Sequence, residues 1–136
     1  MNIFGAIYGI LKNNSAVATI VYDGTIYKIF DLVASQTSTA PFIAVEQVTM
    51  KGNSTKSGVS GTDEYTIKIS MLAETQAQVK DLAEKVRTAL DYYSGTSNGV
   101  VIQQAWFDSE SLIWDDTSHL RGAENISHNY IFRVNR

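Results

Sequence analysis

The sequence predicts an α+β fold, in which an antiparallel β-sheet of about four main strands carries two principal helices on one face. Three observations predict it. Apolar residues recur at helical spacing in two segments, whereas four other segments have the length and composition of strands, and residues 64–72 among them alternate cleanly between apolar and polar side chains. Strands that neighbour each other along the chain, with a helix between two hairpins, favour antiparallel pairing. A length of 136 residues without an internal repeat indicates a single domain over residues 1–136.

The N-terminal part of the chain has the pattern of helices followed by a strand. Apolar residues recur at helical spacing over residues 2–12, which predicts a helix that stops near Asn13-Asn14. Ser15 is the predicted cap of a second, shorter helical segment. We expect a short strand over residues 25–30 and a loop over residues 31–40.

A long hairpin with a flexible tip is predicted in the middle of the chain. Its first strand, residues 42–51, starts directly after Pro41, the one proline in the sequence. Its second strand, residues 64–72, alternates cleanly between apolar and polar side chains. The connector over residues 51–62 is polar and rich in glycine and serine, a composition typical of loops.

The clearest helix and the last strands follow this hairpin. Thr75 and Gln78 have the spacing of a capping box, and an apolar stripe continues beyond them at helical period. Residues 100–107 predict a strand, with residues 109–114 either its continuation or a separate short strand. Residues 126–134 predict the final strand, in which alternate apolar residues share one face.

If successive side chains of each strand point to opposite faces of the sheet, three of the strands have apolar side chains on both faces. A sheet that is covered by helices on one side is expected to be polar on the other. We therefore expect a neighbouring subunit to cover the second face, although isolated apolar residues are also normal on a protein surface. The candidate contact residues on strands are Ile43, Val45, Val101, Phe107, Trp114 and Ile131. The candidate contact residues at the hairpin tip are Gly52, Asn53, Lys56, Gly58 and Gly61.

The composition argues against several functional classes. The net charge is −3 and the sequence pI is about 5.2, without the basic stripe that nucleic-acid-binding proteins show. The chain has no cysteine, which excludes disulfides, thiolate nucleophiles and cysteine metal ligands. No stretch approaches the ~18 apolar residues that a membrane span requires. The apolar N-terminal run lacks the flanks of a signal peptide, so we expect neither feature.

No motif for catalysis, phosphate binding or a cofactor occurs in the sequence. Neither His119 nor His128 has a carboxylate at metal-motif spacing, and His128 lies on the apolar face of a strand, as core or interface histidines do. We expect no enzyme, no metal site and no cofactor. The alternative is a small metal-dependent hydrolase built on one acidic cluster. That cluster comprises Asp108, Glu110, Asp115 and Asp116.

Four stretches, taken in order, resemble a known family. They are the opening pair of helices (AIYGILKNNSAVATIVYDGTIYKI), the strand TAPFIAVEQV, the strand and helix YTIKISMLAET and AQVKDLAEKVRTALD, and the closing strand HNYIFRV. In this order and spacing the chain resembles the tail-completion, or tail-terminator, proteins of long-tailed bacteriophages and prophages. Residues 27–40 depart from the family, which often carries a shorter, proline-containing segment there.

The resemblance implies an α+β subunit that forms a ring, usually a hexamer, at the head-proximal end of the tail tube. Such a ring stops tube polymerisation and joins the tail to the head. The implied partners are further copies of the chain, the tail-tube protein and a head-connector or stopper protein. DNA passes through the lumen without specific binding, and an acidic pI is compatible with that passage. The resemblance places the protein in the virion tail after synthesis in the host bacterial cytoplasm, and it supplies no catalytic residues.

A third reading stays open beside the ring subunit and the hydrolase. It is a monomeric α+β ligand-binding module, for which the second sheet face is expected to be polar.

Overall fold

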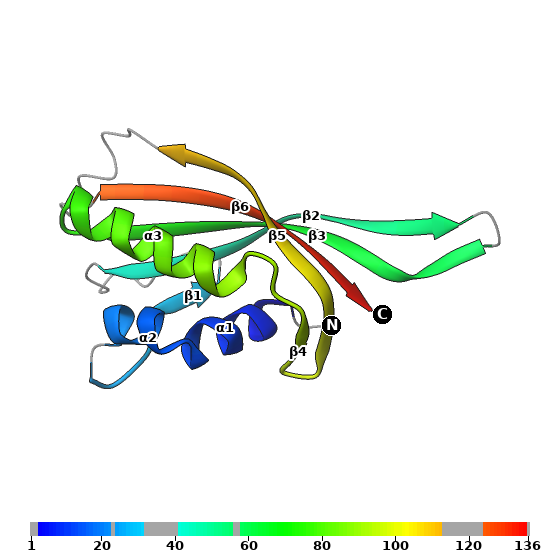
Figure 1. Ribbon diagram of the computed structural model, residues 1–136, viewed down its shortest axis with the longest axis horizontal. Coiled ribbons are helices and arrows are strands. Elements are labelled where there is room, and N and C mark those ends of the chain that lie inside the picture. Colours follow the sequence, from blue (N-terminus) through cyan, green and yellow to red (C-terminus); the bar gives the residue numbers. More distant parts are fainter. Residues whose placement is uncertain (1–2, 23, 32–40, 56–57, 113–123, 136) are drawn as a thin grey trace.

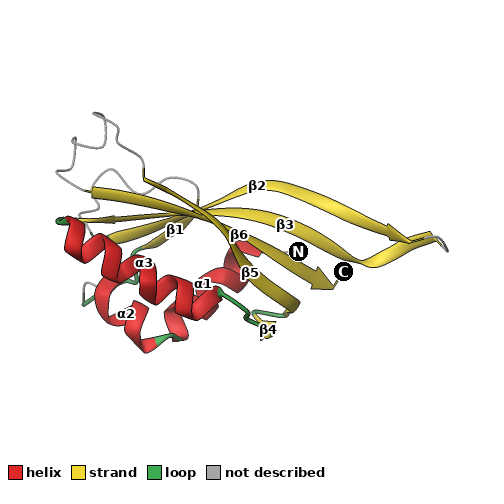
Figure 2. Ribbon diagram, turned by 45° about the horizontal axis from the view of Figure 1, so that its top comes forward, coloured by secondary structure: helices red, strands yellow, loops and turns green. Residues whose placement is uncertain are grey.

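The computed structural model describes residues 3–22, 24–31, 41–55, 58–112 and 124–135. Within these ranges the chain forms a layer of helices against one face of a six-stranded sheet (Figures 1 and 2). The helices are α1 (Ile3–Asn13), α2 (Ser15–Val21) and α3 (Gln76–Leu90). The strands are β1 (Ile29–Asp31), β2 (Phe42–Thr55), β3 (Gly58–Ala73), β4 (Gly95–Ser97), β5 (Val100–Leu112) and β6 (Glu124–Asn135).

The sheet is mixed and has the strand order β1-β2-β3-β6-β5-β4. β1 pairs with β2 in parallel, and every other pair of neighbours is antiparallel. The predicted α+β class is confirmed, but the prediction of about four antiparallel strands is wrong. The outermost strands, β1 and β4, have three residues each. Three residues are too short to show an alternating pattern in the sequence.

The first two helices form where the sequence predicts them, with a different cap between them. One stripe of α1 is buried, from Ile3 to Leu11. The side chain of Asn14 accepts hydrogen bonds from the backbone N–H groups of Ala16 and Val17, at 3.1 and 3.2 Å. Asn14 is therefore the N-cap of α2, and the prediction that Ser15 caps this helix is wrong by one position.

The helix α3 begins at the predicted capping residue. Thr75 Oγ1 accepts a hydrogen bond from the backbone N–H of Gln78 at 3.2 Å, as a capping box requires. The apolar stripe of α3 is buried against β3, β5 and β6. Burial of this stripe holds the helix on the sheet, because each fully buried aliphatic side chain contributes roughly 1.5–3 kcal/mol. The residues of the stripe are Val79, Leu82, Ala83, Val86 and Leu90.

The short strand β4 lies against α1. Ser97 Oγ donates a hydrogen bond to the backbone carbonyl of Ala6 at 2.7 Å. A Cβ on Gly9 would lie 2.8 Å from the same Ser97 Oγ, which is closer than such atoms approach. The glycine in α1 therefore allows β4 to pack closely on this helix.

A β-bulge in β5 changes which of its side chains face the helices. The register with β6 shifts between Ile102 and Gln104 and again between Phe107 and Ser109. A bulge adds one residue, so the alternation changes phase at that point. Ile102, Ala105 and Phe107 consequently share the helix-covered face, and the strict alternation assumed from the sequence is wrong here.

No helix among the described residues is both long enough and apolar enough to cross a membrane.

Candidate assembly surfaces

The hairpin of β2 and β3 extends well beyond the helices as a projecting arm (Figures 1 and 2). We call residues 46–64 the arm. Within the arm the two strands pair from Lys51 and Glu64 outward, and residues 46–50 at its base pair with residues 65–68 of β3. β2 has register shifts after Gln47 and after Gly52. Two large apolar side chains on β2 are exposed in this arm, Val48 at 51% and Met50 at 53%. The prediction of a long hairpin is confirmed, but the predicted connector over residues 51–62 is wrong, because β2 continues to Thr55 and β3 begins at Gly58.

The base of the arm is tied to the last strands of the sheet. Arg133 on β6 forms an ion pair with Glu64 on β3, with 3.1 Å between Nη2 and Oε1. The guanidinium of Arg133 also lies over the ring of Trp106 on β5, 5.7 Å from its centroid. These contacts join three strands on the face away from the helices. They orient the arm relative to the body, although exposed ion pairs contribute only about 0–1 kcal/mol each.

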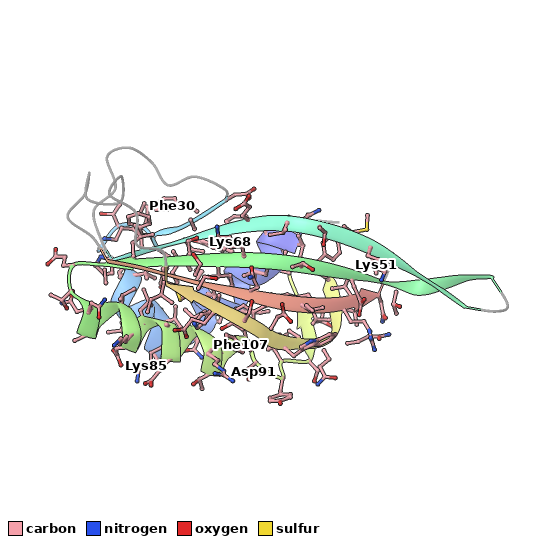
Figure 3. All side chains as sticks on the ribbon, turned by 90° about the horizontal axis from the view of Figure 1, so that it is seen from above. Phe30, Lys51, Lys68, Lys85, Asp91 and Phe107 are labelled. Carbon is pink, nitrogen blue, oxygen red and sulfur yellow. The ribbon has the colours of Figure 1, made fainter. Side chains whose placement is uncertain are left out.

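The open face of the sheet is mainly polar in its middle. Figure 3 looks onto this face, where Lys68 is labelled. One cross-strand row joins Ser70 and Ser127, whose hydroxyl oxygens lie 3.2 Å apart. The next row contains Asn129, whose side-chain amide donates to Ser109 Oγ at 3.0 Å. These rows are polar, so the expectation of an apolar second face is not supported in the centre of the sheet, although Ser127 itself is only 2% exposed.

The structure divides the predicted contact residues into distinct groups. Ile43 and Val45 are 0% and 2% exposed beneath the helices, so this chain itself covers them. Val101 is exposed on the open face, and Ile131 is half-buried there. Phe107 is half-buried on the helix side, where the guanidinium of Arg87 stacks 4.0 Å from its ring centroid.

The other predicted contact residues belong to the arm or lie outside the described part of the chain. Gly52 and Gly61 are exposed on the arm. Asn53 and Gly58 lie within β2 and β3 near its tip. Lys56 and Trp114 lie outside the described residues. All the predicted tip residues that the structure describes therefore lie on the arm, namely Gly52, Asn53, Gly58 and Gly61.

A buried histidine joins β5 and β6 beneath α3. His128 is 2% exposed, and its Nδ1 and Nε2 atoms each lie 3.0 Å from a polar partner. The partners are the Tyr130 hydroxyl and Oε2 of Glu110, so Nε2 carries the proton toward the carboxylate and the Tyr130 hydroxyl donates to Nδ1. Phe107 meets the ring of His128 edge-on at 5.0 Å. The prediction that His128 is a core or interface histidine is thus confirmed, because its ring is buried in the core and both ring nitrogens are hydrogen-bonded.

The environment of His128 shifts its titration. Burial lowers the pKa of His128 below its ordinary value of 6.5, while the Glu110 carboxylate acts against this shift and the Arg87 charge adds to it. Burial also raises the pKa of Tyr130, so its hydroxyl keeps its proton. The network is neutral at its centre and contacts solvent through Glu110, whose side chain is 46% exposed. Its role in the fold is to join β5 and β6 side by side.

The acidic cluster considered for a metal is not assembled as a site in the described residues. Asp108 is exposed at a bulge of β5, whereas Glu110 contacts His128. Asp115 and Asp116 lie outside the described residues, as does His119. The described part of the chain contains no group of three potential metal ligands.

The comparison with known families decides the assignment. A family model for tail completion protein gp17 matches residues 5–126, which is most of the chain. The chain belongs to this family. It is a structural protein of the phage tail, and its location is the tail of the virion. The family is one of structural tail proteins and not of enzymes.

A solved structure shares the fold of this tail completion protein. A chain described as "Virion of native gene transfer agent (GTA) particle" superposes with a TM-score of 0.73 and 19% sequence identity. The match covers 98% of this chain and 95% of that one. At this identity the likeness establishes the shared fold. Among curated proteins, none matches the sequence.

Several residues of these surfaces gave no recognisable signal in the sequence. Met50 alternates in the predicted strand like any other apolar residue, yet it is 53% exposed. The stacking of Arg133 on Trp106 depends on the pairing of β5 with β6, which brings distant segments together.

Proposed function

We propose that this tail completion protein forms a ring of its own copies, usually six, at the head-proximal end of the tail tube. There it stops tube polymerisation and provides the surface that binds the head connector. The observation that carries this proposal is the projecting arm, which leaves the body with apolar side chains exposed. An isolated subunit gains nothing from holding Val48 and Met50 in water, whereas a subunit in an assembly buries them.

The net charge supports the passage of DNA through such a ring. With a charge of −3, the chain lacks the positive field that would hold DNA by its phosphates. The described residues of the open face carry charges of both signs, Glu46 and Lys68 among them, without a basic stripe. A lumen formed by such surfaces allows DNA to pass without retention.

The experiment polymerises the tail-tube protein of the same virion with and without this chain. We expect shorter tubes and a ring at one end of each tube, seen by electron microscopy. The variant Met50→Asp should lose this effect, because it places a charge on the exposed apolar surface of the arm. Tyr92→Asn is the matched control, since Tyr92 is 75% exposed at a site of positive φ that asparagine adopts readily. Unchanged tube lengths with wild-type chain present contradict the proposal.

A further inference from the structure

The sheet has two outer edges, and each is covered over only part of its length in the described residues. On the first, β1 pairs with Ile43–Val45 of β2. The stretch Val48–Gly52 beyond it has no strand partner on its outer side among the described residues. Two bulges in this strand twist the edge but leave its backbone groups free of a second ladder.

The second edge is covered more elaborately. β4 pairs with β5 from Val100 to Ile102. The Tyr93 carbonyl and the Asp91 carboxylate then accept hydrogen bonds from the backbone N–H groups of Ala105 and Phe107, at 2.8 and 3.0 Å. Beyond Phe107, the stretch 108–112 has no strand on its outer side in the described part of the chain. Among the described residues, contacts therefore cover this edge from Val100 to Phe107.

We propose that these two open stretches pair with each other in neighbouring copies of the chain, Val48–Gly52 of one subunit with residues 108–112 of the next. This pairing is the contact between neighbouring subunits in the proposed ring, so the proposal rests on the proposed function. Exposed strand edges are templates for further strands, and proteins that do not use them cover them. Among the described residues the covering ends at Val45 on β2 and at Phe107 on β5, before each proposed contact.

Strand direction makes the two stretches compatible. β2 is antiparallel to β3, β3 to β6, and β6 to β5, so β2 and β5 run in opposite directions. If one sheet is placed beside a copy in the same orientation, β2 meets β5 of the copy as an antiparallel pair. The contact joins two different patches on opposite sides of a subunit. Such a head-to-tail contact is the kind that generates rings.

Charge favours this pairing over pairing of like edges. The stretch on β2 contains one charged side chain, Lys51, which is exposed. The stretch on β5 contains Asp108 and Glu110, both exposed acids. Pairing β2 with β5 places Lys51 one position along the partner strand from both Asp108 and Glu110, whereas pairing β2 with β2, or β5 with β5, brings only like charges into the contact.

The backbone geometry defines one register. The N–H of Ile43 points outward to the Lys28 carbonyl, and the N–H of Phe107 points outward to Asp91. When the register is followed through the bulges, the backbone N–H and C=O groups of Met50 and of Glu110 also point outward from the sheet. Both residues lie at positions of the helix-side face. When these two residues form the hydrogen-bonded pair across the contact, Thr49 lies opposite Ser111 in the adjacent non-hydrogen-bonded pair.

This register staggers neighbouring subunits along the strands. Thr49 lies level with Thr66, and Ser111 lies level with Ser127 and hence with Ser70. The offset from Thr66 to Ser70 is four residues of β3, or about 13 Å at ~3.3 Å per residue. A constant stagger of this kind tilts the strands relative to the axis of a closed assembly, as in β-barrels.

The absence of cysteine gives a direct test by disulfide cross-linking. The variant Thr49→Cys/Ser111→Cys places the only two thiols of each chain in a non-hydrogen-bonded pair, where Cβ atoms lie about 4.5–5.5 Å apart. Within one chain β3 and β6 separate the two positions, so they lie roughly 14 Å apart across the sheet at ~4.8 Å per strand, and about 13 Å apart along the strands at ~3.3 Å per residue, and they cannot join. Under oxidation with copper–phenanthroline, the expected product is a covalent ladder beyond the dimer that disappears on reduction.

The single variants Thr49→Cys and Ser111→Cys and the mispaired variant Thr49→Cys/Thr88→Cys are the controls. They should show less than one-tenth of the cross-linking, and circular dichroism should show the same fold for all four. A dimer formed efficiently by Thr49→Cys alone indicates β2–β2 pairing and overturns the proposal. A ring seen for the reduced double variant that oxidation fails to cross-link also overturns it, while the proposed function stands. If neither a ring nor a ladder forms, both fail.

Discussion

The carboxylate of Asp91 accepts a hydrogen bond from the backbone N–H of Phe107 at 3.0 Å, so the C-cap residue of α3 closes part of the outer edge of β5. The same carboxylate lies 3.5 Å from Nε of Arg87, which stacks on the Phe107 ring. One side chain thereby links the end of α3 to the strand that it covers. The edge that remains open begins where this contact ends.

Removing the Asp91 acceptor should destabilise the fold. We expect Asp91→Ala to lower the free energy of unfolding by about 1–3 kcal/mol, because a half-buried N–H loses its partner. Asp91→Asn keeps an acceptor oxygen and should cost less than half as much. Urea unfolding followed by circular dichroism measures both. Equal losses for the two variants would show that the charge, and not the hydrogen bond to Phe107, matters here.

The buried His128 should make stability depend on pH. Its pKa in the folded chain lies below the ordinary value of 6.5, so the unfolded chain takes up a proton first as the pH falls. The stability that the neutral ring contributes is present above pH 6.5 and is lost as the pH falls from 6.5 toward the lowered pKa. His128→Gln should reduce this slope, whereas His119→Gln, which removes the other histidine, should retain it. Urea midpoints at about pH 7.5 and about pH 5.5 provide the comparison, and an unchanged slope in His128→Gln would refute the assignment.

Burial separates two residues that look alike in the sequence, Ile43 and Met50. Ile43→Ala should lower the free energy of unfolding by about 2–5 kcal/mol, because it leaves a cavity under the helices. Met50→Ala, on the exposed part of the arm, should change it by no more than about 0.5 kcal/mol. Denaturation at a concentration where the chain is monomeric gives both values. A small loss for Ile43→Ala would contradict its place in the core.

The cap of α2 can be assigned by a pair of adjacent substitutions. Asn14→Ala should cost about 1 kcal/mol, since its side chain satisfies two backbone N–H groups at the start of the helix. Ser15→Ala should cost less than about 0.5 kcal/mol, because Ser15 is exposed on the helix. Thermal unfolding resolves a difference of this size. A larger loss for Ser15→Ala than for Asn14→Ala would show that Ser15 is the N-cap, as the sequence indicated.

The extent to which the fold can be predicted from the sequence follows from the length of each pattern. The helix after Thr75 and the strands of the arm are predictable because capping and alternation persist over many residues. β1 and β4 are missed or misplaced because three residues show no period. The faces of β5 are assigned wrongly beyond Gln103, since nothing in the residue types marks the bulge that changes the phase.

The candidate surfaces are predictable only where they depend on local pattern. Two alternating strands joined by a glycine-rich connector are enough to predict the long hairpin. The burial of Val45 and the exposure of Val48, three residues further along, depend on where the helices end over the sheet. The acceptor that Asp91 offers to Phe107 depends on a tertiary contact across 16 residues of chain. Such relationships have no signature in a single sequence.

Ring formation is tested by the mass of the assembly that this chain forms. Native mass spectrometry of the purified chain at tens of micromolar, with and without the tail-tube protein, measures that mass, and electron microscopy of the same samples shows the shape. We expect one closed oligomer of a single stoichiometry, seen as a ring. A strictly monomeric chain in the presence of assembled tube would contradict the proposed function.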